Sequence, residues 1–347
     1  MENFEFKSPY GLLKGVKWEI DKPKAIIVIV TGMAEYAKRY FDFASFLNNN
    51  GYSVFSLDHF GQGENCVLYG DNVNKEIKVT GLNNLINSYN DKLKQNNNLK
   101  NKKFLETFLN SIDQSETQYL GYPIDDFFVK EIDLFHNFFE YLKETYNLKT
   151  YVFSHSMGSF LMQGYIEKYS NKYIDKLVLC GTNGKNFLIK FGAFLSKLIV
   201  NDKNKFYPAT LLHDLSIGAY EKAFKDRKDA NDWLSYNEDN VKKYNEDKLC
   251  GYRCSNSFFK SFLSGLSEIQ KNKNIKNISK ELNILIIGGA DDPVGNFGKG
   301  LNNLFKLYSK FNLDVSLIIY EQARHEILNE LIKDKVYQDI LKFYQNI

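Results

Sequence analysis

Six short runs of β-branched and aromatic residues recur along the chain, separated by longer stretches in which apolar residues follow helical spacing. Three of these runs, IIVIV, LVL and ILII, are apolar at successive positions, as strands buried on both faces of a sheet require. Strands that alternate with helices in this way predict an α/β protein with a mainly parallel sheet covered on both faces. The expected strands are residues 25–30, 52–57, 150–153, 176–179, 283–287 and 314–320.

Amphipathic helices are expected between these strands. Residues 128–142 place Phe, Ile and Leu at spacings of three and four, which predicts a helix leading into the strand at residue 150. A second helix is expected directly after Ser156, and a last one over residues 326–343.

Two stretches interrupt the alternation. Residues of about 66–116 are rich in Asn and Lys, which predicts a solvated polar insertion. Residues 183–281 separate the fourth and fifth expected strands and are too long for a simple connection, yet they carry Phe, Leu and Trp at helical spacing. We therefore expect an α/β core made of residues 1–182 and 282–347, with residues 183–281 forming a helical cap over the sheet.

The composition narrows the class of protein further. The 347 residues are 44% hydrophobic and 25% charged, as in ordinary globular domains. Lys and Arg total 45 against 42 Asp and Glu, and the net charge of +3 is spread along the chain. Because nucleic-acid-binding proteins concentrate their basic residues on one face, we expect no nucleic-acid partner.

The cysteines and the lengths of the apolar runs indicate the cellular compartment in which the protein is expected. No stretch reaches the roughly 18 apolar residues of a membrane-spanning helix, and the first residues lack the apolar run of a secretory signal. The four cysteines, at positions 66, 180, 250 and 254, form neither a repeated Cys-x-x-Cys pair nor a dense disulfide framework. These features favour a cytoplasmic protein with reduced thiols, at most peripheral to membranes.

One segment carries the strongest chemical signal. Residues 151–159, YVFSHSMGS, form a β-run that ends abruptly in Ser-x-Ser-x-Gly and is followed by a helical pattern. This context is that of a nucleophile elbow, in which a strained turn between strand and helix exposes a serine hydroxyl. Ser156 is then the candidate nucleophile, with Ser154 at the position that usually holds Gly.

A serine hydroxyl becomes a strong nucleophile only when a base such as histidine removes its proton and a carboxylate orients that histidine. Of the five histidines, only His325 follows a late core strand, where a loop at the carboxyl edge of the sheet belongs. Two acids follow the preceding strand. Asp292 is favoured by its Gly-x-x-Asp spacing from Gly289, whereas Asp291 has the same spacing from Gly288 and stays an alternative.

Hydrolysis through a tetrahedral intermediate also requires two backbone N–H donors. The residue after the nucleophile, Met157, supplies one, and Met33, in the loop after the strand at 25–30, is the candidate for the other. The motifs of a zinc-protease helix, a phosphate-binding P-loop and a dinucleotide fingerprint are all incomplete. We therefore expect no metal and no cofactor.

Several short blocks of sequence, considered together, resemble those of one known family. They are TGMAEY at 31–36 with RY at 39–40, LDHFGQG at 57–63, the elbow, DPVG at 292–295 and RHEILNE at 324–330, with DWLS at 232–235 and DKLCGY at 247–252 in the cap. Together they resemble the monoglyceride lipase and lysophospholipase branch of the serine α/β-hydrolases, in particular its bacterial lysophospholipase-like members.

This resemblance implies an α/β-hydrolase fold and a triad of Ser156, Asp292 and His325. It also implies that a lysophospholipid or a monoacylglycerol is the substrate. Glu35 and Arg39 match charged residues of the family's oxyanion block, and we expect them to form a structural pair.

The cap contains one strongly apolar helical segment, residues 187–199. Phe191, Phe194 and Leu198 are expected to line the entry for an acyl chain, and the same helix is able to contact a lipid surface transiently. The alternative is that this face only packs the cap against the sheet.

The expected activity is therefore hydrolysis of the carboxylic ester of a single-chain glycerolipid through an acyl-enzyme. A general carboxylesterase or an acyltransferase would use the same triad. A non-catalytic binding protein with a hydrolase fold is the alternative from another class. The head group, the acyl-chain length and the oligomeric state are left open.

Overall fold

The computed structural model describes residues 1–65, 121, 125–202, 204–205, 207–225 and 227–346. The polar insertion expected at about 66–116 lies outside the described residues. Within them, eight strands form one sheet in the order β1-β2-β4-β3-β5-β6-β7-β8. Their bounds are β1 Glu2–Ser8, β2 Gly11–Trp18, β3 Ile26–Val30, β4 Ser53–Leu57, β5 Thr150–His155, β6 Lys176–Cys180, β7 Asn283–Gly289 and β8 Val315–Tyr320.

The sheet is mostly parallel. Neighbouring strands from β4 to β8 run parallel, whereas β2 pairs antiparallel with both β1 and β4. All six predicted strands are present, which confirms the α/β class. The sequence pattern does not predict β1 and β2. Most residues of β1, at the edge of the sheet, are exposed or half-buried, and half of the residues of β2 are half-buried, so neither strand is an unbroken apolar run.

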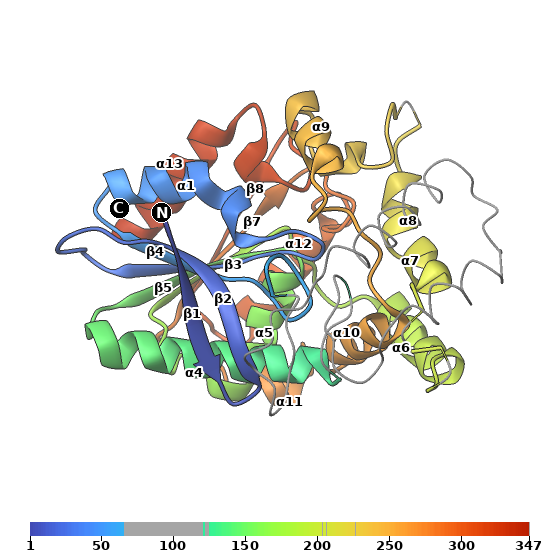
Figure 1. The fold of residues 1–347 in the computed structure, drawn as a ribbon, viewed down its shortest axis with the longest axis horizontal. Helices are drawn as coiled ribbons and strands as arrows, with labels where there is room; N and C mark the ends of the chain where they lie inside the picture. The colour runs from blue at the N-terminus through green and yellow to red at the C-terminus, as the bar shows by residue number, and fades with distance from the viewer. Residues whose placement is uncertain (66–120, 122–124, 203, 206, 226, 347) are drawn as a thin grey trace.

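Helices cover both faces of the sheet (Figure 1). In the central strand β3, Ile26, Val28 and Val30 pack toward α4, α5 and α12, while Ile27 and Ile29 pack toward α1 and α13. The unbroken apolar run of β3 therefore fills two hydrophobic cores, one on each face. The helices are α1 Phe41–Asn49, α4 Phe127–Tyr146, α5 Met157–Tyr169, α12 Lys299–Lys310 and α13 Lys333–Gln345, with a short turn η1 at Ala37–Tyr40.

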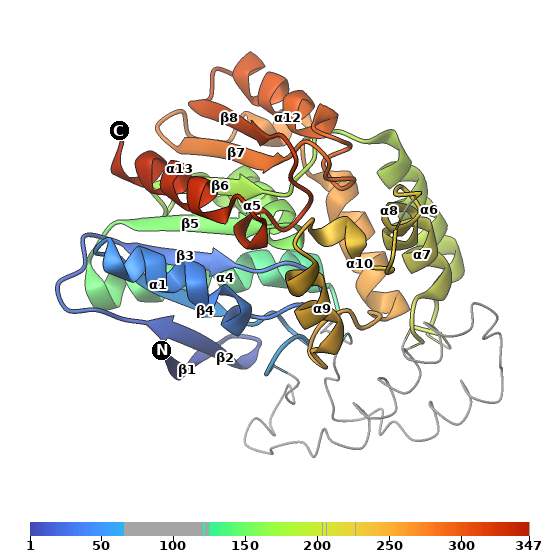
Figure 2. The same ribbon diagram turned by 90° about the horizontal axis from the view of Figure 1, so that it is seen from above.

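The segment between β6 and β7, which we call the cap, lies beyond the carboxyl ends of the parallel strands (Figure 2). Its helix α10 packs against α6 and against α4 of the core. The loops that follow β3, β5, β7 and β8 therefore face the cap. Its elements are α6 Phe187–Ile199, α7 Thr210–Leu215, α8 Ile217–Glu221, η2 Asp232–Leu234, α9 Glu238–Glu246, α10 Asn256–Glu268 and α11 Asn272–Ile275.

The last helix begins later than predicted. The sequence pattern places its start at residue 326, but α13 begins at Lys333, and only a short 3₁₀ turn, η3 Ile327–Asn329, precedes it. The Glu326 N–H donates to the carbonyl of Leu234 in the cap at 2.7 Å. The prediction is wrong at this end because the residues after His325 bond to the cap instead of continuing a helix.

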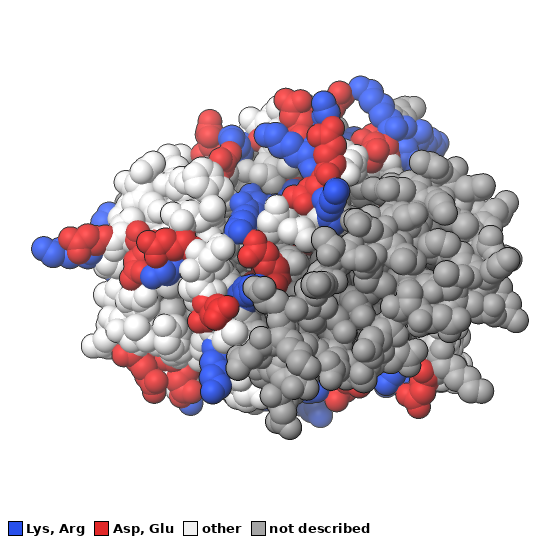
Figure 3. Space-filling model, in the orientation of Figure 1, with Lys and Arg blue, Asp and Glu red and all other residues white. Residues whose placement is uncertain are grey.

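Charges of both signs are interspersed on the described part of the face shown in Figure 3. None of the helices in the described ranges is both long enough and apolar enough to cross a membrane.

Candidate active site

The turn at Ser156 is strained in the way that an elbow requires. Ser156 has φ 51° and ψ −118° between the end of β5 and the start of α5. A positive φ is unfavourable for a residue with a side chain and is found where the surrounding structure enforces it. A Cβ atom on Gly158 would lie 2.3 Å from the carbonyl oxygen of Val30, so only glycine fits where α5 approaches β3.

Ser154, which stands in place of the usual glycine, is accommodated inside the sheet. Its side chain is fully buried, and its hydroxyl donates to the carbonyl of Val178 on β6 at 2.7 Å. The extra hydroxymethyl group thus has a hydrogen-bond partner and leaves the turn intact.

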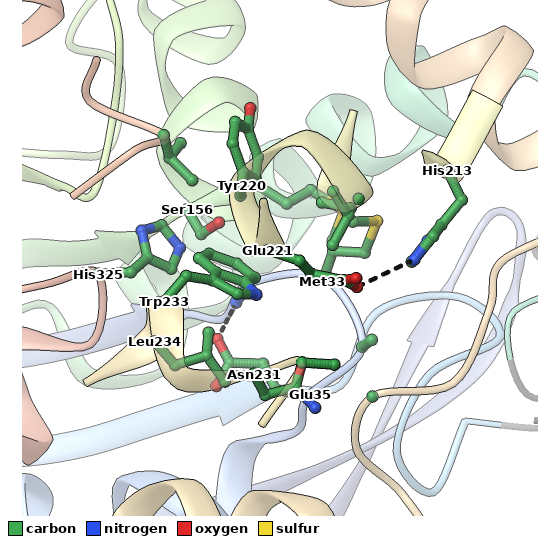
Figure 4. Close-up of a pocket in the computed structure, with 18 of the residues that line it drawn as sticks. Met33, Glu35, Ser156, His213, Tyr220, Glu221, Asn231, Trp233, Leu234 and His325 are labelled. Carbon is green, nitrogen blue, oxygen red and sulfur yellow. Dashed lines mark hydrogen bonds and ion pairs between the residues drawn. The ribbon is translucent and has the colours of Figure 1, made fainter. Parts of the chain in front are cut away.

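The structure brings His325 and Asp292 together. His325 Nδ1 lies 3.0 Å from Asp292 Oδ2, and both side chains are buried, with exposures of 2% and 0%. The other oxygen of Asp292 accepts the Val294 N–H at 2.8 Å, which fixes the carboxylate. With Nδ1 engaged by Asp292, Nε2 is the nitrogen left for the hydroxyl of Ser156, which lies beside the ring in Figure 4.

The competing acid points elsewhere. Asp291 Oδ2 accepts the hydroxyl of Tyr236 at 3.0 Å, on the cap side. Of the two acids that the sequence left open, the one placed against His325 is therefore Asp292.

The two residues expected to supply backbone N–H donors line the same cavity as Ser156. Met33 and Met157 both line it, and in the described part of the chain neither amide donates a hydrogen bond to another residue. The amides on both sides of Met33 are held, since Gly32 N–H donates to Glu35 Oε1 and Ala34 N–H donates to Gln62 Oε1 at 2.8 Å. The loop around Met33 is thus fixed by its neighbours, while the Met33 N–H has no hydrogen-bond acceptor among the described residues.

The cavity is built by both the core and the cap. Its volume of about 510 Å³ falls in the range of small-molecule sites. Apolar side chains from α5, α8, α10 and the cap turn η2 line it, and Figure 4 shows Trp233 and Leu234 beside the catalytic candidates. The apolar lining residues are Met33, Met157, Phe160, Ile217, Trp233, Leu234, Phe259, Phe262 and Val294.

Polar side chains from the cap also line the cavity. His213 Nε2 lies 3.9 Å from Glu221 Oε1, and Arg253 Nη1 lies 3.2 Å from Asp214 Oδ1. Burial, together with the nearby charge of Arg253, lowers the pKa of His213 to about 3, so His213 is neutral at physiological pH. The cavity therefore combines apolar and polar side chains from both the core and the cap.

The structure does not bring the three predicted cap residues to this cavity. Phe191 and Phe194 are each 60% exposed and Leu198 is 66% exposed, on the outer side of α6. The buried residues of α6 are instead Ala193 and Ser196. Helical spacing identified the apolar helix correctly, but none of the residues of α6 is among those that line this cavity.

Two aromatic neighbours of His325 were missed by reasoning from the sequence. The rings of Trp233 and His155 lie with centroids 5.1 Å and 4.7 Å from that of His325. The only signal for Trp233 was the DWLS block in the cap. His155 is the variable residue of the elbow motif, and nothing in the motif gives it a function.

A match to a family model defines the class. The model described as "Serine aminopeptidase, S33" matches residues 21–105 and 114–332, and the chain therefore belongs to this family of α/β-hydrolases. This confirms the fold and the serine hydrolase class that the sequence blocks imply. No curated protein matches the sequence significantly.

Solved structures share the fold at low sequence identity. A thermostable carboxyl esterase from Bacillus coagulans, in complex with glycerol, has a TM-score of 0.78 at 20% identity and covers 100% of this chain and 99% of its own. A monoglyceride lipase from Saccharomyces cerevisiae, a soluble variant with a substrate analog, has a TM-score of 0.67 at 14% identity, with coverages of 99% and 94%. A monoacylglycerol lipase from Paleococcus ferrophilus has a TM-score of 0.60 at 17% identity, with coverages of 95% and 97%.

Proposed function

We propose that the protein hydrolyses the carboxylic ester of a single-chain glycerolipid, a monoacylglycerol or a lysophospholipid, through an acyl-enzyme on Ser156. The observation that carries the proposal is the contact of His325 with Asp292 at 3.0 Å, beside a serine on a strained turn that opens into the cavity. Asp292 holds His325 in the tautomer whose Nε2 accepts a proton.

The reaction divides into two steps. In the first, His325 Nε2 takes the proton of Ser156 while Oγ attacks the ester carbonyl, and the amides of Met33 and Met157 bind the oxyanion. Collapse of the intermediate releases the alcohol, which receives that proton from His325. In the second step His325 takes a proton from a water molecule, whose oxygen attacks the acyl-enzyme carbonyl. Collapse of this second intermediate frees the fatty acid, and His325 returns the proton to Ser156 Oγ.

The mixed apolar and polar lining of the cavity supports the substrate class. Each buried methylene of an acyl chain gains about 0.8 kcal/mol at best, and the apolar walls offer such burial next to Ser156. The polar side chains in the cap suit a hydrophilic head group. The esterase and the monoacylglycerol lipases with the same fold are examples of this chemistry in related architectures.

We also propose that residues 183–281 work as a cap on the core of residues 1–182 and 282–347, and that α6 contacts lipid surfaces transiently. Exposed apolar side chains of this size gathered on one helix are typical of interaction sites. They are Phe187, Leu188, Phe191, Phe194 and Leu198, with Lys190 and Lys197 on the same helix.

The test is product analysis over a panel of substrates. Monoacylglycerols of several chain lengths, lysophosphatidylcholine, a short nitrophenyl ester and an aminoacyl anilide are each incubated with the wild type and with Ser156→Ala. We expect Ser156-dependent release of fatty acid that increases with chain length. Cleavage of the anilide alone, or transfer of the acyl group to an added alcohol without hydrolysis, would contradict the proposal.

A further inference from the structure

The side chains of Glu35, Arg39, His155 and Glu326 form a buried charge cluster at the wall of the cavity, which all of them except Arg39 line. Arg39 Nη1 lies 2.7 Å from Glu35 Oε2, and its two Nη atoms donate to the two oxygens of Glu326 at 2.9 Å each. His155 Nδ1 lies 3.1 Å from Glu35 Oε1. Each of these side chains is at most 11% exposed, so the cluster is shielded from water.

The cluster joins three loops that carry the reacting groups. Glu35 accepts the N–H of Gly32, directly before the oxyanion candidate Met33. Glu326 follows His325 in the chain, and His155 precedes Ser156. His155 Nε2 also lies 3.3 Å from the backbone carbonyl oxygen of His325. A shift of any member therefore moves the base or the oxyanion loop.

The protons of His155 follow from its two partners. A carboxylate and a backbone carbonyl can only accept hydrogen bonds, so each nitrogen of the His155 ring must carry a hydrogen to bond to both. A neutral imidazole has only one N–H. The geometry therefore requires the doubly protonated, cationic ring.

The charge balance of the cluster leads to the same conclusion. The carboxylates of Glu35 and Glu326 carry two negative charges against one on the guanidinium of Arg39, which leaves one negative charge to be neutralised. An uncompensated buried charge is costly, and a cationic His155 removes it.

The direction of the pKa shifts agrees with a cationic ring. Burial alone would lower the pKa of His155, but the hydrogen bond and negative charge of Glu35 outweigh it and raise the pKa. Burial would raise the pKa of Glu35, but the contacts with His155 and Arg39 lower it to about 2.

We propose that His155 is a permanent imidazolium at physiological pH and acts as a positioning residue, which holds the loops of His325 and Met33 in register with Ser156. The charged or titratable groups that face it are Glu35, Glu326, Arg39, the ring of His325 and the thiol of Cys180 on β6. Burial raises the pKa of Cys180 well above its usual value, so this thiol stays neutral.

The protonation state is tested without reference to activity. In ¹H–¹⁵N spectra of protein labelled with ¹⁵N-histidine, recorded at pH 7.5, about one unit above the ordinary pKa of histidine, His155 should show both ring nitrogens protonated. The signal is assigned by its loss in His155→Gln or, if that variant does not fold, by elimination with variants of the other four histidines. A neutral-tautomer pattern for His155 at this pH would overturn the proposal.

The positioning role rests on the proposed function and is tested by kinetics. His155→Gln should lower kcat at least tenfold with KM changed less than about twofold, because the misplaced groups act in the transition state. In Glu35→Gln, which removes the charge that holds the proton, the alkaline limb of the kcat profile should move to lower pH.

The matched control is His136→Gln. His136 lies on α4, outside the cluster, and its ring stacks on Tyr169 with the centroids 3.7 Å apart. The pH profile of this variant should equal that of the wild type.

An alkaline limb of the kcat profile that Glu35→Gln does not move would contradict the positioning role. If no Ser156-dependent hydrolysis exists at all, the proposed function fails, and the spectra still decide the state of His155.

Discussion

At the scale of single residues, two adjacent carboxylates differ in what they touch. Asp292 contacts His325 Nδ1, whereas Asp291 accepts only the hydroxyl of Tyr236 among the described residues. The spacing Gly-x-x-Asp fits both acids, so the sequence could favour Asp292 but not exclude Asp291. Only the position of the side chain relative to His325 separates them.

We therefore predict unequal effects for the two amide substitutions. Asp292→Asn should lower kcat by about 10⁴-fold, because the amide favours the wrong tautomer of His325. Asp291→Asn should lower it less than tenfold. Steady-state kinetics on a short soluble ester compare the two variants, and the reverse ranking would move the triad acid to Asp291.

The contacts of His155 could not be predicted from the sequence. The motif identifies Ser156 because its spacing reflects a local turn, which neighbouring residues determine. The partners of His155, Glu35 and the His325 carbonyl, lie 120 and 170 positions away in the chain. No local pattern reports such contacts. The expected pair of Glu35 and Arg39 is present, with Nη1 2.7 Å from Oε2, but the addition of His155 and Glu326 to it became visible only in the structure.

At the scale of elements, strands with unbroken apolar runs were predictable because both of their faces are buried. β3 and β7 are of this kind, and they place the loops of Met33 and Asp292. β1 escaped prediction because its exposed edge leaves no such run. The direction that α6 faces also escaped, since most of the residues along this helix are apolar.

Two glycine substitutions, one at the elbow and one in α6, should have opposite effects. Gly158→Ala should destroy activity or folding, because its Cβ would meet the carbonyl oxygen of Val30 at 2.3 Å. Gly192→Ala, within α6, meets nothing nearer than 3.6 Å and should raise stability by up to about 1 kcal/mol through helix propensity. Thermal unfolding and ester hydrolysis measure both variants, and full activity of Gly158→Ala would contradict the elbow geometry.

The outer side of α6 predicts an effect that depends on the physical state of the substrate. Phe194→Asp should reduce hydrolysis of long-chain monoacylglycerol presented in vesicles while leaving a soluble butyrate ester unaffected, because Phe194 is exposed and lies outside the cavity. The matched control is Phe41→Asp, which alters a 50% exposed side chain on α1, on the core. Equal loss on both substrates would show that Phe194 supports the cap's packing instead.

At the scale of the whole molecule, buried carboxyl groups should shape the dependence of stability on pH. Burial raises the pKa of Glu167, on α5, to about 7, even though its carboxylate accepts the N–H of Gln270. When the folded-state pKa of a carboxyl group lies above its unfolded value of about 4.3, the unfolded state releases the proton first as the pH rises. The free energy of unfolding of the protein therefore falls between these two pH values.

Glu167→Gln should therefore stabilise the protein at pH 8, by up to about 3 kcal/mol, and make no difference near pH 4. Chemical denaturation at both pH values measures the change. Glu144→Gln, at an exposed position on α4, is the matched control and should show no such pH dependence. A Glu167→Gln variant less stable than the wild type at pH 8 would show that the buried carboxylate is needed in its charged form.

Across the molecule, elements far apart in the chain converge on Ser156, the proposed nucleophile. Labelling with a fluorophosphonate followed by peptide mapping tests this directly, because a serine activated by a base attacks phosphorus as it attacks an ester carbonyl. We predict one adduct per folded chain, located on Ser156, and none on Ser156→Ala. An adduct on another residue, or no adduct on the folded wild type, would contradict the assignment of Ser156 as the nucleophile of a serine hydrolase.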